Sequence, residues 1–461
     1  MAEVSQTGLL KAPDAGARMD EASSAEAAAY ALGLLAVQWG MQWVKGGLVF
    51  RAMGNPLPAG VERTPFDPFP HEVNVWGHAR ELITHEFHVI ETPNTETLYS
   101  TALLDVADGP VIVVHPDFGE RYYRTSIWEG HGDTHTIGER TYGSQPPPLA
   151  IVPLGWSGEL PDGVERIEIR SRYVNVGPHI AVYGADDLPN VYELQKGLRL
   201  HDLAGFTSGA AIAPGKPLRP ARRPDTGTPP ELMFFEELCE MLKDLTVRED
   251  ELAFARQLER IGITLDAGFQ FDTLDEPTVN GLKRAVLDGQ SILQHRAQAL
   301  APPQPGGTWL SGYGWTSVED WLLRGAVGWG YVWADADKEI LFPMARQDAK
   351  GDKLDGSRRY TLRFPAGEHP PARYWRISMY DDEGFFTDNP IHRYGIGNMA
   401  EHLDLDADGS LTITIQHDPP AQETNWLPCP EGEFFMVLRM YQPEQRMYDG
   451  NYTVPPVTPV T

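Results

Sequence analysis

The sequence has very few cysteines and comparatively few basic residues. Cys239 and Cys429 are the two cysteines among 461 residues. A disulfide framework is therefore excluded, and we expect two buried, unreactive thiols in a protein of a reducing, cytoplasmic compartment. Lysine and arginine total 38 against 65 acidic residues, giving a formal net charge of −27. This charge repels phosphate backbones and anionic lipids, so it argues against nucleic acid and membrane partners; it also keeps a large protein soluble.

Long uninterrupted hydrophobic runs are also missing. The most apolar early stretch, residues 27–50, is interrupted by Gln38, Gln42 and Lys45, and the segment before it is acidic. A signal peptide would have a basic start, and a membrane span would have a continuous apolar stretch. We therefore expect an amphipathic helix here. The glycine-rich stretches lack the spacing of phosphate or dinucleotide loops, so we expect no nucleotide cofactor.

What the sequence does have is enough apolar material for more than one core. Hydrophobic residues make up 41% and aromatic residues 10% of the chain. Two regions, residues 98–183 and 360–441, hold short segments rich in β-branched and aromatic residues and bounded by Gly, Pro and Asp. Such segments are typical of antiparallel sandwiches. Apolar residues at helical spacing fill residues 228–300.

These patterns predict an α+β fold, predominantly antiparallel β, with two β-sandwich or jelly-roll-like modules and a helical connector. We expect four parts. They are a flexible N-terminus (residues 1–22), an N-terminal β-rich module with a leading helix (residues 23–213), a linker and helical connector (residues 214–330) and a C-terminal jelly-roll-like module (residues 331–461).

Ordered motifs in both modules carry a family resemblance. Residues 92–100 read Thr-Pro-Asn-Thr-Glu-Thr-Leu-Tyr-Ser and residues 137–143 read Ile-Gly-Glu-Arg-Thr-Tyr-Gly. The C-terminal module has Tyr-Trp-Arg-Ile-Ser-Met-Tyr at residues 374–380 and Asn-Trp-Leu-Pro at residues 425–428. The first pair resembles domain of unknown function 1254 and the second pair is similar to domain of unknown function 1214. The resemblance implies the two-module fold and almost nothing about chemistry.

Two departures from the family pattern lie in the N-terminal module. Glu96 stands where the first motif normally has aspartate, and residues 131–135 differ from a typical member. In that segment His131, Asp133 and His135 alternate, so a strand would place them on one face, where they could bind a divalent metal ion. The alternative is the polar face of an edge strand or a hydrated loop, because the glycines at 130 and 132 weaken the strand pattern.

A second candidate cluster surrounds the first motif. Asn94, Glu96, Tyr99 and Tyr123 supply an amide, a carboxylate and phenols, which are the groups that general acid–base catalysis requires, and Arg121 is a candidate substrate ligand. The alternative is a buried turn in which Asn94 and Glu96 cap backbone groups.

In the C-terminal module, Arg393, Tyr394 and Trp426 form a candidate clamp for a carboxylate or an aromatic group. Alternatively, Arg393 holds the fold together through backbone carbonyls. His85 and His88 have no third ligand nearby in the sequence, which favours ordinary core or surface histidines.

We therefore expect an enzyme that acts on a small-molecule substrate in a cleft between the modules. The expected chemistry is acid–base, of hydrolase or lyase type, with or without a divalent metal ion. The alternative is a non-catalytic ligand-binding or assembly protein. A homo-oligomer is compatible with both.

Overall fold

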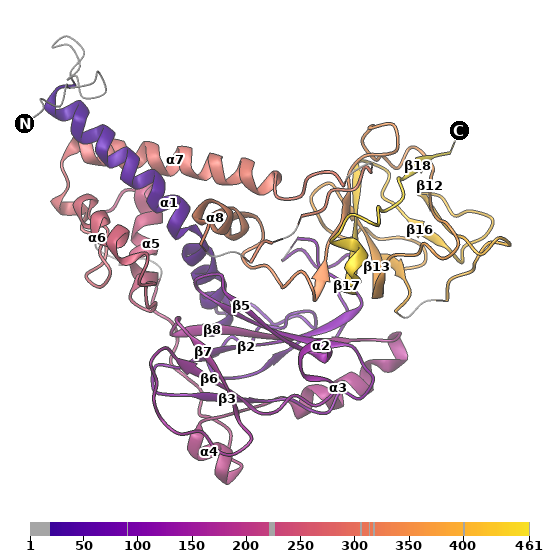
Figure 1. Ribbon diagram of the computed structural model, residues 1–461, viewed down its shortest axis with the longest axis horizontal. Helices are drawn as coiled ribbons and strands as arrows, with labels where there is room; N and C mark the ends of the chain where they lie inside the picture. Colours follow the sequence, from indigo (N-terminus) through magenta and orange to yellow (C-terminus); the bar gives the residue numbers. More distant parts are fainter. Residues whose placement is uncertain are drawn as a thin grey trace, which may run out of the picture.

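The computed structural model describes residues 19–89, 91–220, 226–304, 307–312, 314–316, 319–399 and 402–460. Most of the N-terminal segment expected to be flexible, residues 1–18, lies outside the described residues. In Figure 1 a layer of helices occupies the upper left, the N-terminal module lies below it and the C-terminal module lies to the right.

The helical layer is built around the long first helix, α1 (Glu21–Gly54), which begins at the capping side chain of Asp20. α1 covers the predicted helix and packs against helices of the connector: α5 (Met233–Leu242), α6 (Leu252–Leu258), α7 (Glu276–Gln298) and α8 (Trp321–Gly330). Figure 1 shows α1 and α7 side by side. The leading helix therefore shares its core with the connector. Within the described part of the chain, no helix combines the length and apolarity needed to cross a membrane.

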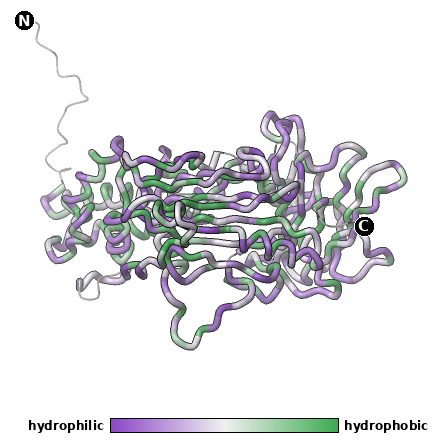
Figure 2. Tube along the Cα trace, turned by 90° about the horizontal axis from the view of Figure 1, so that it is seen from below, coloured by the Kyte–Doolittle hydropathy of each residue, from purple (hydrophilic) through white to green (hydrophobic). Residues whose placement is uncertain are grey.

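Two sheets form the N-terminal module. The first is antiparallel, with β1 (Gly77–His78), β2 (Thr97–Asp105), β8 (Tyr173–Ala181), β4 (Tyr123–Glu129) and β5 (Thr134–Gly138) in that order. The second contains β7 (Glu165–Ile169), β6 (Leu149–Pro153), β3 (Val111–Val114) and β9 (Arg199–His201), of which β6 and β7 are parallel. Apolar residues of both sheets form one buried core. In Figure 2 hydrophobic stretches run along the strands in the middle of the view.

Short helices and 3₁₀ turns lie in the N-terminal module, in the connector and, in one case, in the C-terminal module after β17. They are α2 (Glu139–Tyr142), α3 (Leu188–Gly197), α4 (Leu203–Ser208) and the 3₁₀ turns Ala185–Asp187, Pro230–Leu232, Glu259–Ile261, Phe271–Thr273 and Gln445–Met447.

The C-terminal module is a second two-layer sandwich. One sheet has β10 (Ile340–Leu341), β17 (Phe434–Pro443), β13 (Ala372–Asp381) and β14 (Gly395–Gly397), with β11 (Met344–Ala345) also paired to β17. The other has β16 (Trp426–Pro428), β15 (Leu411–Gln416), β12 (Tyr360–Phe364) and β18 (Thr458–Pro459). The sheets share one core. The predicted α+β fold with two β-rich modules and mostly antiparallel sheets is confirmed, and both cysteines are free and buried as expected.

Apolar side chains join the two modules. Ile83 and Phe87 of the N-terminal module pack with Tyr380, Tyr394 and Phe435 of the C-terminal module in one buried cluster. A second cluster joins residues near β4 and β8 to β10 and β17. The modules therefore meet over a packed interface, and polar groups within it are withdrawn from water.

Candidate functional site

A buried carboxylate lies in the interface between the modules. Glu96, immediately before β2, is 2% exposed. Tyr441 of β17 donates a hydrogen bond to Glu96 Oε1. Arg376 Nε lies 3.6 Å from Glu96 Oε2, and Arg439 Nε lies 4.0 Å from Oε1. Because an isolated buried carboxylate is costly, these C-terminal partners make the first motif dependent on the other module.

Arg439 also fixes the backbone that precedes Glu96. Its Nη2 donates to the carbonyl oxygens of Thr92, at 2.5 Å, and Pro93, at 3.2 Å. Its Nη1 donates to the Tyr380 hydroxyl at 2.7 Å, and that hydroxyl donates to the Pro93 carbonyl. The guanidinium thus meets several acceptors in a fixed geometry, which a lysine could not reproduce.

A second ion pair crosses the interface nearby. Arg124 of β4 lies 2.7 Å from Asp335 Oδ2, and Ser126 donates to Asp335 Oδ1 at 2.5 Å. The same guanidinium is 3.2 Å from His179 Nδ1. Burial and the Arg124 charge hold the pKa of His179 well below its ordinary value, so the ring is neutral and accepts this bond. His179 in turn stacks on Tyr99, with ring centroids 4.1 Å apart.

A cavity of about 200 Å³ lies where these groups meet the connector. Its walls include Trp315, Tyr331, Trp333, Asp335 and Asp337, together with Thr92 of the first motif, residues of β10 and β11, and Arg439 of β17. Burial raises the pKa of the Asp337 carboxyl, which accepts a bond from the Gly314 N–H at 2.7 Å. The cavity therefore combines aromatic walls with carboxyl groups in different environments.

Comparison with known proteins identifies the two modules. The family model described as protein of unknown function DUF1254 matches residues 73–202, and the one described as protein of unknown function DUF1214 matches residues 339–445. The chain pairs a DUF1254 domain with a DUF1214 domain. The resemblance expected from the motifs is confirmed.

A solved structure shares this architecture. The VPA0106 protein from Vibrio parahaemolyticus has a similar fold, with a TM-score of 0.70 and 22% identity over 94% of this chain and 100% of that one. An uncharacterized protein from Burkholderia cenocepacia aligns over 98% of this chain and 91% of its own at 12% identity and a TM-score of 0.43. No protein among the curated ones matches the sequence.

The DUF1254 motif residues form a tight turn. Asn94 Oδ1 accepts from the backbone N–H of Glu96, at 3.3 Å, and of Thr97, at 3.0 Å, and from the Thr97 hydroxyl. The Asn94 N–H donates to the Tyr99 hydroxyl at 3.2 Å. The structure thus brings Asn94, Glu96 and Tyr99 together. They have the geometry of the alternative interpretation, a buried turn in which side chains cap backbone groups.

Arg121 and Tyr123 make their bonds elsewhere. Arg121 pairs with Asp187, with Nη2 2.8 Å from Oδ1, and Tyr123 donates to the Gly143 carbonyl at 2.6 Å. The neighbouring Tyr122 faces the DUF1214 domain instead, where it bonds to Glu339 at 3.0 Å and contacts the Tyr441 ring. The sequence pattern favoured Tyr123 as the partner of the Glu96 cluster, whereas Tyr122 is the member of the pair that lies there.

His131, Asp133 and His135 do not converge. β5 begins at Thr134, and a turn with Gly132 at φ +93° precedes it, so the strand alternation assumed for the trio is absent. His131 is fully buried against Trp43, with ring centroids 5.5 Å apart. His135 Nε2 lies 3.2 Å from Glu129 Oε1. The expectation that one strand would place the three side chains on the same face was wrong, because Gly132 allows the chain to turn before the strand begins.

The DUF1214 clamp residues also serve the fold. Arg393 Nη1 donates to the carbonyl oxygens of Glu423 and Trp426, each at 2.7 Å. Trp426 is buried, and its indole N–H donates to the Gln416 carbonyl. Tyr394 is 5% exposed and lies in the interface. Arg393 therefore has the arrangement of the alternative interpretation, a bridge between backbone carbonyls.

Several residues that build this region were not predicted from the sequence: Arg124, Asp335, Asp337, Arg376, Arg439 and Tyr441. The available signal was a charged residue inside an otherwise apolar strand. Arg376 lies within the buried run 375–380 of β13 and Arg439 within the buried run 434–441 of β17, and a buried arginine requires a partner.

Proposed function

We propose that the chain is an enzyme that binds a small organic molecule in the cavity between its modules and carries out acid–base chemistry of hydrolase or lyase type. The single observation behind this proposal is the lining of the cavity, where Asp335 and Asp337 lie among Trp315, Tyr331 and Trp333. Apolar walls with a few polar groups are typical of ligand sites.

The two carboxyl groups suit different roles. Asp335 is held by Arg124 and Ser126, so it is the candidate base. Burial raises the pKa of Asp337, which makes it the candidate acid. Pairs of carboxyls in contrasting environments divide these roles in known enzymes.

The cavity also limits the substrate. At about 200 Å³ it is smaller than typical drug-sized pockets, which span roughly 300–1,000 Å³. Trp315 and Tyr331 pack with ring centroids 4.9 Å apart, and the Trp333 indole N–H is fixed on the Glu129 carbonyl at 2.8 Å. Aromatic faces and carboxyl groups favour a compact molecule that carries a cationic or hydrogen-bond-donating group beside an apolar part.

Benzylamine, benzyl alcohol and benzoate are suitable probes because they share one ring and differ in charge. We expect saturable binding of benzylamine, measured by tryptophan fluorescence. We expect about ten-fold or greater weakening in Asp337→Asn, because the bound ammonium group favours the ionised form of Asp337, which an amide cannot provide. The control is Asp186→Asn, which removes the same negative charge at an exposed aspartate. This variant should bind benzylamine like wild type. Equal benzylamine affinity in wild type and Asp337→Asn would contradict the proposal that this cavity is the binding site.

A second candidate is a ligand-binding or assembly protein without catalysis. It is supported by the internal bonds of Asn94, Arg121 and Arg393, which leave these side chains engaged in the fold. Mass spectrometry after incubation with a panel of small esters, amides and hydroxy acids distinguishes the two candidates. Product formation lost in both Asp335→Asn and Asp337→Asn supports the enzyme, whereas binding with unchanged recovery of every compound supports the second candidate.

A further inference from the structure

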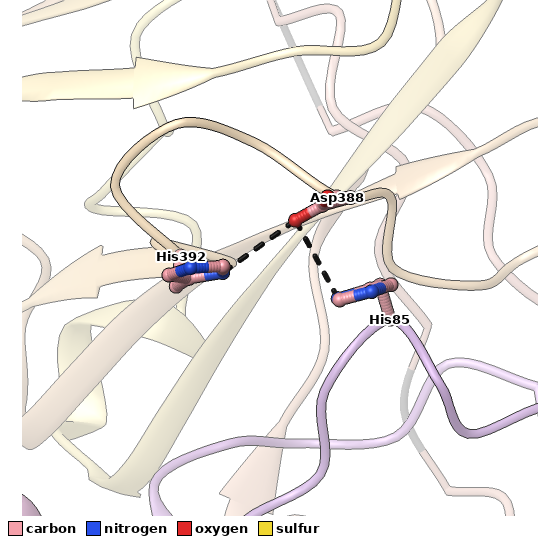
Figure 3. A group of neighbouring side chains, drawn as sticks. All are labelled: His85, Asp388 and His392. Atoms are coloured by element: carbon pink, nitrogen blue, oxygen red, sulfur yellow. Dashed lines mark ion pairs between the residues drawn. The ribbon is translucent and has the colours of Figure 1, made fainter.

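Two histidines and one aspartate from opposite modules meet at the interface, and none of the three lines the cavity. Figure 3 shows Asp388 between the imidazoles of His85 and His392, with His85 on the DUF1254 side and the other two on one DUF1214 loop. Potential ligand atoms of the three side chains all lie within 4.8 Å of one another. Among the residues that the structure describes, no other group of three or more His, Cys, Asp or Glu side chains has all its ligand atoms within 4.8 Å of one another.

The spacing of the three groups matches metal ligands better than hydrogen bonds. Asp388 Oδ1 lies 3.7 Å from His85 Nδ1 and 3.5 Å from His392 Nδ1. Hydrogen bonds between nitrogen and oxygen are shorter, at about 2.7–3.2 Å. Ligands that sit about 2.0–2.2 Å from a tetrahedral zinc ion are roughly 3.3–3.5 Å from each other. Small side-chain movements would therefore bring all three onto one ion.

The loops that carry these ligands are held in place before any ion binds. His85 lies between Ile83 and Phe87, whose buried side chains pack into the DUF1214 domain. The Phe87 N–H donates to the Thr84 carbonyl at 3.2 Å and closes a turn around His85. The Tyr394 hydroxyl lies 2.8 Å from His85 Nδ1, and because a metal ion would take the lone pair of that nitrogen, the ion would replace this hydrogen bond.

The second loop is equally constrained. Pro390 follows Asn389 in a turn closed by a bond from the His392 N–H to the Asn389 carbonyl at 3.0 Å. The Asn389 side chain bonds to both backbone groups of Arg393. His392 adopts a left-handed φ of 47°, which costs a non-glycine residue free energy and directs its ring toward Asp388.

We propose that His85, Asp388 and His392 form a binding site for a divalent transition-metal ion, of which zinc is the type example, and that the ion links the DUF1254 and DUF1214 domains. Two imidazoles and one carboxylate are a ligand set that such ions take. The side chains are 32%, 64% and 72% exposed, so an ion can enter from solvent and keep water on its remaining positions. The excess of acidic residues further favours a cation. This proposal is independent of the function proposed for the cavity.

The test is zinc titration of the full chain after treatment with a chelator, by calorimetry and by metal analysis. We expect one zinc ion per chain, with affinity reduced at least about ten-fold in His85→Ala and in His392→Asn. Asparagine is chosen at position 392 because it tolerates a left-handed backbone, so that loop keeps its shape. Urea denaturation without zinc checks that both variants are folded.

His402→Ala is the matched control. His402 is an exposed histidine whose Nε2 lies 3.1 Å from Asp404, and it belongs to no group of three. Zinc should bind this variant as it binds wild type, and zinc should raise the melting temperature of both but not that of His85→Ala. The proposal is overturned if wild type takes up no stoichiometric zinc, or if His85→Ala and His392→Asn bind zinc as wild type does.

Discussion

Arg376 of β13 and Arg439 of β17 occupy directly opposed positions, and the guanidinium groups of both lie near the carboxylate of Glu96. Like charges opposed across a sheet are unfavourable. Their pairing is therefore tolerable because the other module supplies a negative charge to both. The interface is consequently an electrostatic requirement of the DUF1214 sheet as well as an apolar contact.

Removing the charge of Glu96 should destabilise the whole chain. In Glu96→Gln the two buried arginines lose their shared carboxylate, and we expect a loss of about 3–5 kcal/mol in the free energy of unfolding. Urea denaturation measures it. Glu193→Gln, at an exposed glutamate, controls for the change in net charge and should unfold like wild type. A Glu96→Gln variant as stable as wild type would show that the arginines do not depend on this carboxylate.

Acid should weaken the fold through His131. Burial, followed by the nearby Arg324 charge, lowers the pKa of His131 to about 3. An unfolded histidine titrates near 6.5, so the unfolded state binds the extra proton below that pH. The contribution of neutral His131 is complete above pH 6.5 and is lost as the pH falls toward 3.

The measurable consequence is a decrease in the free energy of unfolding as the pH falls from 7 to 5, and the slope of that decrease can be compared between variants. At pH 5 the single site should cost about 2 kcal/mol relative to pH 7. His131→Phe keeps an aromatic ring against Trp43 and removes the titrating group, so its stability should fall less between pH 7 and 5. His402→Ala, at an exposed histidine, should retain the wild-type slope. Identical slopes for His131→Phe and wild type would exclude this residue as the cause.

Arg393 offers a test of structural against ligand-binding roles. In Arg393→Lys a shorter side chain ends in an ammonium group, which does not reach the position of Nη1, the atom that donates to the carbonyls of Glu423 and Trp426. We expect a loss of about 1.5–3 kcal/mol, because lysine cannot reproduce that geometry. Arg359→Lys, in the same domain, is the control. Unchanged stability of Arg393→Lys, together with weaker binding of benzoate, would restore the clamp hypothesis.

Local patterns predicted much of the fold because they depend on short-range physics. The first strand-rich region was expected to begin at residue 98, and β2 begins at Thr97, since β-branched and aromatic residues favour a half-buried strand in almost any context. Both domains were likewise identifiable from their motifs, because each motif is a short continuous run of residues.

The candidate site was less predictable because its partners are distant in the chain. Choosing Tyr123 over Tyr122 was a one-residue error, and in extended chain one residue reverses the side-chain face. The prediction that His131 shares a strand face with Asp133 and His135 was wrong for a different reason. A turn at Gly132 stands where the metal hypothesis assumed a strand.

Composition alone excluded a disulfide framework, because the chain has only two cysteines. Periodicity alone predicted the two β-rich modules and the helical connector. The tertiary structure decided which charges meet. It brought Arg376 and Arg439 to Glu96, Arg124 to Asp335, and Asp388 and His392 to His85, a histidine for which the sequence offered no third ligand. Periodicity reports only which face of its own element a residue occupies, whereas an ion pair or metal site depends on how separate elements pack.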